Sequence, residues 1–301
     1  MSSSTNPRTR RAQIGGIGLV NLATFTWATN MALGRWLRDD VGPLTLAAAR
    51  FSIASLLFAI LLQRRPAQEH RLGRDRWLLL GMAFSGVAFF APTLYLGLRY
   101  TTAINATLLN GLGPLITGGV AVLLIREPMS GRQVVGAVVG LLGVMILISG
   151  GSLAFWQTMR SNVGDLIVLG AVVLWGVYSV LGRQVMRHRS PLSTTAMSAF
   201  LGLPFLLITA AWELGTFAIN ISPTLILAIL YIGVAPTVIG FLAWNAGVRR
   251  LGAGGAMVFY NTLPLYGALL GYLFLGESIG VVHLLGGALI VGGGLWAARR
   301  Q

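Results

Sequence analysis

Aromatic and amide side chains recur inside the long apolar stretches of this chain, where they could bind a small polar molecule. Asparagine amides can hydrogen-bond the charged groups of such a molecule, and tryptophan or tyrosine rings can form an apolar wall for the rest of it. For any single residue, packing between helices, or for the aromatics a belt at the membrane surface, explains the position equally well. The candidate binding residues are Trp27, Tyr95, Asn110, Trp175, Tyr178, Trp244, Asn245, Tyr260 and Asn261.

Two of these tryptophans, Trp27 and Trp175, occupy unusually deep positions. Each lies more than half-way along an apolar stretch, and the two are 148 positions apart. That depth is too great for a belt at the side where the stretch starts. We therefore expect both rings to lie in the interior.

Prolines interrupt several of the apolar stretches. A proline within a helix removes one hydrogen bond and frees the carbonyl four residues earlier, which must then face protein or water rather than lipid. For Pro114 and Pro264, which are 150 positions apart, the freed carbonyls belong to Asn110 and Tyr260. We expect a hinge or a lined cavity at this pair, with a static kink as the alternative. The full set is Pro92, Pro114, Pro204, Pro236 and Pro264.

The residue types on which most enzymes depend are scarce or absent. The chain has no cysteine, all of its 22 basic residues are arginine, and its three histidines are far apart. Thiolate catalysis, lysine Schiff bases and cysteine-type metal sites are thereby excluded. We expect no catalytic residues, no metal site and no cofactor, and hence no enzyme.

Charge inside the apolar stretches is rare. No acidic residue lies in the middle of one, which argues against a proton relay of the usual kind. Glu127 and Glu277 are expected to tie helix ends by hydrogen bonding. Arg50 is the one clear cation, and we expect it to snorkel outward or to pair with a backbone carbonyl, with the binding of a substrate carboxylate as the weaker alternative. The acids are Asp39, Asp40, Glu69, Asp75, Glu127, Asp165, Glu213 and Glu277.

Ten apolar stretches position these residues. The mean hydropathy is +0.76 and only 10% of residues are charged, against roughly 25% in an ordinary soluble domain. A membrane-spanning helix needs about 20 mostly apolar residues. The sequence therefore predicts an all-α integral membrane protein with ten transmembrane helices. The expected spans are 14–33, 44–62, 77–97, 102–125, 133–151, 164–183, 192–212, 223–246, 254–275 and 279–298.

The two halves of the chain repeat one another. PLITGGVAVLLIREP, from Pro114, corresponds to PLYGALLGYLFLGES, from Pro264. Because each half holds five spans, an odd number, the second half must start on the opposite side of the membrane, so the repeat is inverted. Glycines such as Gly136 and Gly286 predict close packing of the fifth and tenth spans. The predicted organisation is a cytoplasmic tail at 1–13, a first repeat at 14–151, a linker loop at 152–163 and a second repeat at 164–298.

The arginines indicate the orientation. With the N-terminus inside, 17 of the 22 arginines fall in inner loops and tails, as the positive-inside rule requires. Both termini are then cytoplasmic. The net charge of +14 could suggest nucleic acid, but its spread over short loops between apolar spans fits a membrane protein better, and no nucleic-acid partner is expected.

The order of several short motifs resembles one transporter superfamily. They are Trp27 with Asn30, PLTLAAARF at Pro43–Phe51, the Pro114–Glu127 and Pro264–Glu277 spans, and GDLIVLGAVVLWGVYSV at 164–180. In this order they resemble the drug/metabolite transporters, and more narrowly the EamA-type ten-helix exporters, over about residues 14–298. The resemblance implies a ten-helix inverted repeat with the fifth and tenth helices at one edge and a central cavity between the others. It also implies a structural role for Arg50, which matches an arginine of the family's second helix.

The resemblance further implies export of small metabolites, often amino acids, and the aromatic content of the candidate site is most like that of aromatic amino-acid exporters. We expect a carrier that exports aromatic and other large neutral amino acids by alternating access from the cytoplasm across a bacterial inner membrane. A monomer in the lipid bilayer is compatible with this. The alternatives are a multidrug carrier, a nucleotide-sugar carrier, a channel and a membrane enzyme. This chain lacks the features that the last three would need. These are phosphate-binding cations other than Arg50 for a nucleotide-sugar carrier, charged rings or a filter loop for a channel, and a nucleophile–base pair for an enzyme.

Overall fold

The structure, a computed structural model, describes residues 7–152 and 162–298. Every regular element in these ranges is helical, as predicted. The first half contains α1 (Pro7–Trp36), α2 (Pro43–Gln63), α3 (Arg76–Met82), η4 (Ala83–Phe89), α4 (Phe90–Tyr100), α5 (Ala103–Asn110), α6 (Gly113–Ile125) and α7 (Gly131–Ser149). The second half contains α9 (Val163–Val185), α10 (Pro191–Glu213), α11 (Pro223–Val234), η5 (Ala235–Ile239), α12 (Gly240–Tyr260), α13 (Thr262–Leu275) and α14 (Val281–Ala298). Short 3₁₀ turns are η1 (Leu37–Asp39), η2 (Ala67–His70) and η3 (Gly73–Asp75).

Most of the predicted linker and the first six residues of the predicted tail lie outside the described residues. Helix α1 already begins at Pro7, seven residues before the predicted span.

Local sequence explains where several helices begin. Ser190 and Ser222 cap α10 and α11, and in both cases a proline follows at the first helical position. A serine hydroxyl satisfies one free N–H of the first turn, and proline has no N–H to lose there. At α7, Ser130 and Gln133 form a reciprocal capping box.

By length and composition, five helices among the described residues could cross a membrane, or six if the bent pair α5 and α6 is one broken span. The pair is bent by 46°, and Pro114 lies in the first turn of α6, so this segment does break where the proline predicts. Three further apolar helices are shorter, so the number ten stays a prediction.

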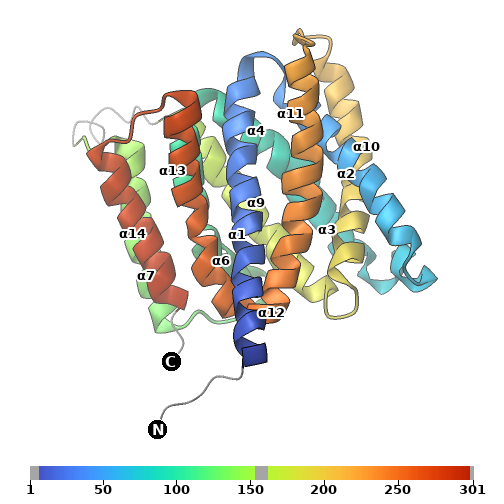
Figure 1. The fold of residues 1–301 in the computed structure, drawn as a ribbon, viewed down its shortest axis with the longest axis horizontal. Helices are drawn as coiled ribbons and strands as arrows, with labels where there is room; N and C mark the ends of the chain where they lie inside the picture. Colours follow the sequence, from blue (N-terminus) through green and yellow to red (C-terminus); the bar gives the residue numbers. More distant parts are fainter. Residues whose placement is uncertain (1–6, 153–161, 299–301) are drawn as a thin grey trace.

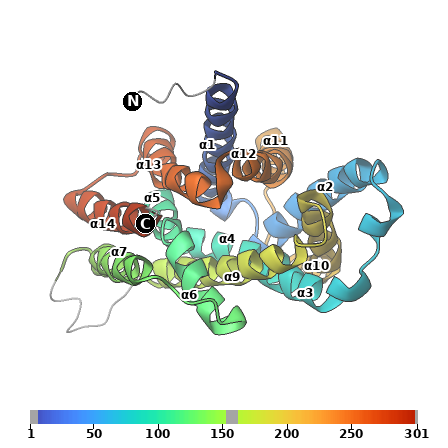
Figure 2. The same cartoon turned by 90° about the horizontal axis from the view of Figure 1, so that it is seen from below.

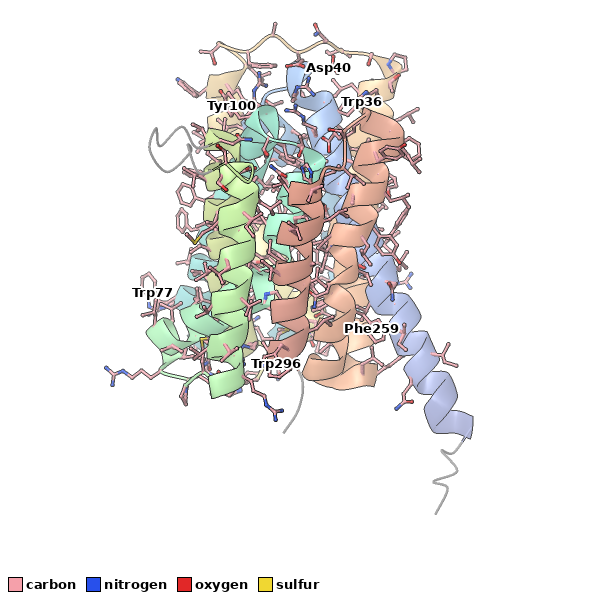
Figure 3. The ribbon with its side chains drawn as sticks, turned by 90° about the vertical axis from the view of Figure 1, so that its left-hand side faces the viewer. Trp36, Asp40, Trp77, Tyr100, Phe259 and Trp296 are labelled. Carbon is pink, nitrogen blue, oxygen red and sulfur yellow. The ribbon has the colours of Figure 1, made fainter. Side chains whose placement is uncertain are left out.

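The outer surface is apolar along the helices. Large side chains such as Leu123, Ile208 and Phe274 are exposed, as expected for a surface in contact with lipid. Exposed aromatics lie towards both ends of the molecule, with Trp36 at one end and Trp77 at the other (Figure 3). This pattern matches aromatic belts at two membrane surfaces.

The helices run roughly alongside one another, and α1 begins at the same end at which α14 finishes (Figure 1). We call this the terminal end and the opposite one the far end. Viewed from the terminal end, α7 and α14 lie together at one edge, and α2, α3 and α10 at the other (Figure 2). The remaining helices lie between these edges.

Glycines allow α7 and α14 to touch backbone to backbone. A Cβ added at Gly136 would lie 2.5 Å from the carbonyl oxygen of Gly293, and one added at Gly143 would lie 2.6 Å from that of Gly286. No larger residue fits at such distances without separating the helices. The close packing predicted for these two helices is confirmed.

Candidate functional site

A cavity of about 490 Å³ lies between α6, α9, α12 and α14. It reaches the surface at the terminal end, beside the turn between α6 and α7. Glu127 and Arg183 line this mouth, with side chains that are 54% and 48% exposed, and they form an ion pair of 3.4 Å. The cavity is therefore open at one end of the molecule.

Aromatic rings surround the deep end of this cavity. Trp27 is at the centre of the cluster, with ring centroids 6.2 Å from Trp175, 5.9 Å from Phe241, 5.6 Å from Trp244 and 6.1 Å from Tyr260. These separations are within the range in which aromatic rings attract one another through their edges and faces. These rings form the apolar deep end of the cavity.

A second cavity of about 40 Å³ lies on the other side of these rings, further along α1 from the terminal end. Four residues line both cavities, and we call them the aromatic layer: Trp27, Trp175, Phe241 and Tyr260. The polar side chains of the small cavity are Asn30, Arg50 and Asn110. The aromatic layer thus separates a large aromatic-walled cavity from a small one, whose lining is mostly apolar and holds these three polar side chains.

Arg50 is 3% exposed, so the prediction that it snorkels outward is wrong. Its Nε donates to Thr237 Oγ1 at 2.6 Å and its Nη1 donates to Tyr95 OH at 3.2 Å. Both of these bonds go to hydroxyl groups rather than to a backbone carbonyl. Tyr95 OH in turn donates to Asn30 Oδ1 at 2.7 Å, which makes a buried polar chain across α1, α2, α4 and η5.

The π-helical segment η5 positions this chain and the aromatic layer together. Thr237 donates its hydroxyl to the carbonyl of Ile232, five residues earlier, at 2.8 Å, while it accepts from Arg50. The carbonyl of Pro236 accepts from Trp27 Nε1 at 3.1 Å. A π segment within an α-helix often marks a functional position. Here it holds Arg50, which lines the small cavity, and Trp27, which lines both cavities.

The structure places the candidate binding residues in three groups. Lining the large cavity are Trp27, Trp175, Tyr178, Trp244, Asn245 and Tyr260. Asn110 lines the small cavity, as do Trp27, Trp175 and Tyr260. Tyr95 and Asn261 are buried but belong to neither lining. Their roles in binding stay predictions, and Tyr95 is linked to the small cavity through its hydrogen bonds to Arg50 and Asn30.

The two prolines of the predicted hinge differ in position. Pro114 lines the large cavity, whereas Pro264 is buried near the start of α13 and lines neither cavity. Asn261 lies directly before α13 and packs against α14, because a Cβ added at Gly294 would be 3.2 Å from its Oδ1.

Sequence reasoning missed Thr237 and Phe241. Thr237 follows Pro236 in an apolar stretch, and this Pro-Thr pair is the only local signal for a helix irregularity that could present a hydroxyl. Phe241 carries no signal that separates it from the other phenylalanines of the chain.

The far end is tied together by hydrogen bonds. Glu277 accepts from the backbone N–H of Ala103 at 2.8 Å and of Ile104 at 3.0 Å, which confirms its predicted role at a helix end. Asp165 accepts from Asn105 Nδ2 at 3.1 Å and from the hydroxyl of Thr101. These contacts join α13, α5 and α9. None of these six residues lines either cavity.

The repeat mate of Glu277 behaves differently. Within the part of the chain that the structure describes, the Glu127 side chain caps no helix and instead pairs with Arg183 at the mouth of the cavity. Its predicted role in tying a helix end by hydrogen bonding is therefore not seen in this conformation.

No group of three or more His, Asp or Glu residues gathers as a metal site in the part of the chain that the structure describes. The cavities therefore present aromatic, amide, hydroxyl and guanidinium groups, which suit reversible binding.

Comparison with known proteins gives a consistent class. The EamA-like transporter family matches residues 14–149 and 162–298. YyaM of Bacillus subtilis (strain 168), described as an uncharacterized transporter, is 28% identical over 284 residues, which are 94% of this chain and 92% of YyaM. A probable terminal-alkyne amino-acid exporter of Streptantibioticus cattleyicolor is 26% identical over 280 residues, which are 93% of this chain and 92% of the exporter. A crystal structure with 24% identity superposes with a TM-score of 0.62 over 95% of each chain and supports the fold alone.

Proposed function

The chain belongs to the EamA-like transporter family, and from this we propose that it exports amino acids, aromatic and other large neutral ones included, out of the cytoplasm by alternating access. The observation that carries the proposal is the cavity of about 490 Å³ whose deep end is the aromatic layer. Its volume falls within the range of about 300–1,000 Å³ that small-molecule sites occupy. The similarity to a probable amino-acid exporter supports the same class of substrate.

The chemistry of the walls suits a zwitterion with a large side chain. Trp175, Tyr178 and Trp244 offer ring faces to an apolar or aromatic side chain. Asn245 lies in the same lining and can hydrogen-bond the charged groups of the amino acid. A carrier of phosphorylated substrates needs several cations instead, and Arg183 at the mouth is the only arginine of this lining among the described residues.

We propose that the ten predicted helices form two inverted five-helix repeats. Three packing relations support this arrangement. Helix α1 packs against α12 and α13, and its counterpart α9 packs against α4 and α6. Helix α2 packs against its counterpart α10. On α7 and α14, Gly136 meets Gly293 and Gly143 meets Gly286, so each glycine contacts the repeat mate of the other one.

The asymmetry between Glu127 and Glu277 supports alternating access. Glu277 caps α5 at the far end, on the backbone of Ala103 and Ile104. The positions 150 residues later are Ala253 and Gly254. In this conformation α12 runs unbroken through both residues. In the opposite conformation, α12 is expected to open there, and Glu127 to leave Arg183 and accept from these two backbone N–H groups, closing the terminal end as Glu277 closes the far end.

The orientation and location complete the proposal. The distribution of arginine supports a cytoplasmic terminal end, so that the conformation described here is open to the cytoplasm. The proposed location is a bacterial inner membrane. The protein is proposed to act on a small-molecule amino-acid substrate, as a monomer or a larger assembly.

Export from intact cells tests this function. Cells are loaded with a phenylalanine-containing dipeptide, whose hydrolysis raises internal phenylalanine, and the appearance of phenylalanine outside is measured with and without the chain. Faster export in cells that express the chain is expected. Expulsion of a lipophilic cation with no effect on any amino acid would instead identify a multidrug carrier.

A further inference from the structure

The guanidinium of Arg50 is buried without a negative partner. The residue is 3% exposed and takes part in none of the ion pairs that the structure contains among the described residues, which include all eight acids. Glu213, the acid that contacts the same helix, accepts from the backbone N–H groups of Leu44 and Thr45 at the start of that helix. A buried cation is normally paired, because isolated burial of charge is strongly unfavourable.

The groups that do contact Arg50 orient it without neutralising it. Thr237 and Tyr95 accept from one N–H of Nε and one of Nη1, out of the five N–H donors of a guanidinium. Both hydrogen-bond partners are hydroxyl groups, held in turn by Ile232 and Asn30, and the guanidinium carbon lies 5.2 Å from the centroid of the Phe51 ring. The guanidinium is thus fixed in direction, as a binding group should be, and carries donors beyond those that the two hydroxyls use.

Arg50 lines the small cavity, which has the size of a carboxylate rather than of a side chain. Its volume of about 40 Å³ compares with about 10–15 Å³ for one water on this measure. A carboxylate group fits such a space, whereas an aromatic ring does not. Asn110 belongs to the same lining, with its amide nitrogen donating to the carbonyl of Ala106 at 2.9 Å.

We propose that the small cavity is an anion subsite in which Arg50 binds the carboxylate of the transported substrate. This inference rests on the proposed function and narrows it, since the cargo must then carry a carboxylate. The carboxylate lies beyond the aromatic layer and accepts from the guanidinium, which matches it in charge and in planar geometry. The side chain of the substrate stays in the large cavity, between Trp175 and Trp244. The rings of the aromatic layer must part to let the substrate pass between them, and this joins the two cavities into one site.

Three ligands that differ in one charged group test the subsite. L-phenylalanine carries both charges, 3-phenylpropionate has the carboxylate only, and 2-phenylethylamine has the amine only. Binding of each is measured on the purified protein in lipid nanodiscs, with the wild type, Arg50→Gln, Arg50→Lys and, as a matched control for loss of one arginine, Arg74→Gln, at an exposed position that lines neither cavity. The readout is the ratio between the affinities for phenylalanine and for phenylethylamine. A loss of folded protein reduces the number of binding sites for both ligands alike and leaves this ratio unchanged.

The wild type is expected to bind phenylalanine at least tenfold more tightly than phenylethylamine. Arg50→Gln should reduce that ratio to about one, Arg50→Lys should keep part of it, and Arg74→Gln should leave it unchanged. A wild-type ratio near one, or a ratio that survives in Arg50→Gln, overturns the proposal even when phenylalanine is transported. If Arg50→Gln does not fold, the wild-type ratio and Arg50→Lys still decide.

The same ligands separate this inference from the proposed function. Binding of 3-phenylpropionate that depends on Arg50, without binding of any amino acid, would retain the subsite and reject amino-acid export. Amino-acid transport with no dependence on the carboxylate would retain export and reject the subsite.

Discussion

Replacing Trp175 by alanine should weaken the transport of aromatic substrates selectively. The ring of Trp175 lies within 5.1 Å of those of Phe90 and Tyr178, 5.6 Å of Phe241 and 6.2 Å of Trp27, measured between centroids. It lines both cavities, so its removal takes away one of the four rings of the aromatic layer and leaves three. A substrate ring then loses one aromatic contact, worth about 1 kcal/mol beyond area burial, which corresponds to about fivefold in affinity.

The assay is uptake of phenylalanine and threonine into proteoliposomes at equal amounts of reconstituted protein. Trp175→Ala should raise the KM for phenylalanine about fivefold and change that for threonine much less, because threonine has no ring to lose a contact. Trp175→Phe should restore most of the difference. Trp212→Ala is the control, since this tryptophan is 70% exposed on the outer face of α10. Equal losses for both substrates would indicate damage to folding or gating, and no loss at all would refute the aromatic wall.

Three further changes test the topology, the helix packing and the helix-end carboxylates. In a chain without native cysteine, Glu69→Cys should react with an impermeant maleimide only from the cytoplasm and Gly215→Cys only from outside; reaction from one side for both would reject the inverted repeat. Gly143→Val should lower the thermal midpoint of the purified protein and separate α7 from α14, since a Cβ there would lie 2.6 Å from a backbone oxygen; an unchanged midpoint would contradict the close packing. Glu127→Gln and Glu277→Gln should each retain transport, reduced at most in part, because the amide oxygen still accepts one of the two hydrogen bonds that the carboxylate of Glu277 accepts; abolished transport in a folded protein would assign that carboxylate a role in proton coupling.

The sequence predicts the helical class and several residues of the site because these depend on local patterns. The positions of Trp27 and Trp175 relative to the repeat bring both into the aromatic layer, where their rings lie 6.2 Å apart. The packing of α7 on α14 follows from glycine spacing alone. In each case the residue type and its position in the repeat are sufficient to predict the contact, because the neighbouring helix can pack closely only against that pattern of residues.

The polar network around Arg50 depends on information that spacing does not contain. Thr237 reaches the guanidinium because η5 adopts a π-helical segment, which shifts the register of the residues after it. Tyr95 faces Arg50 rather than a cavity, and a period of 3.6 residues cannot distinguish these two directions when a helix is buried on most sides. The difference between Glu127 and Glu277 is likewise a property of one conformation, and equivalent positions in a repeat predict only that the two can exchange roles.

Counterflow of radiolabelled phenylalanine in proteoliposomes is the most direct test of amino-acid transport by this protein. Vesicles with the purified chain are loaded with unlabelled phenylalanine and diluted into a trace of labelled phenylalanine, and protein-free vesicles serve as the reference. Transient accumulation of label in the protein-containing vesicles, competed more strongly by external tryptophan than by threonine, is the expected result. Label at the level of protein-free vesicles for phenylalanine and for every other amino acid tested, in a preparation that remains folded, would contradict it.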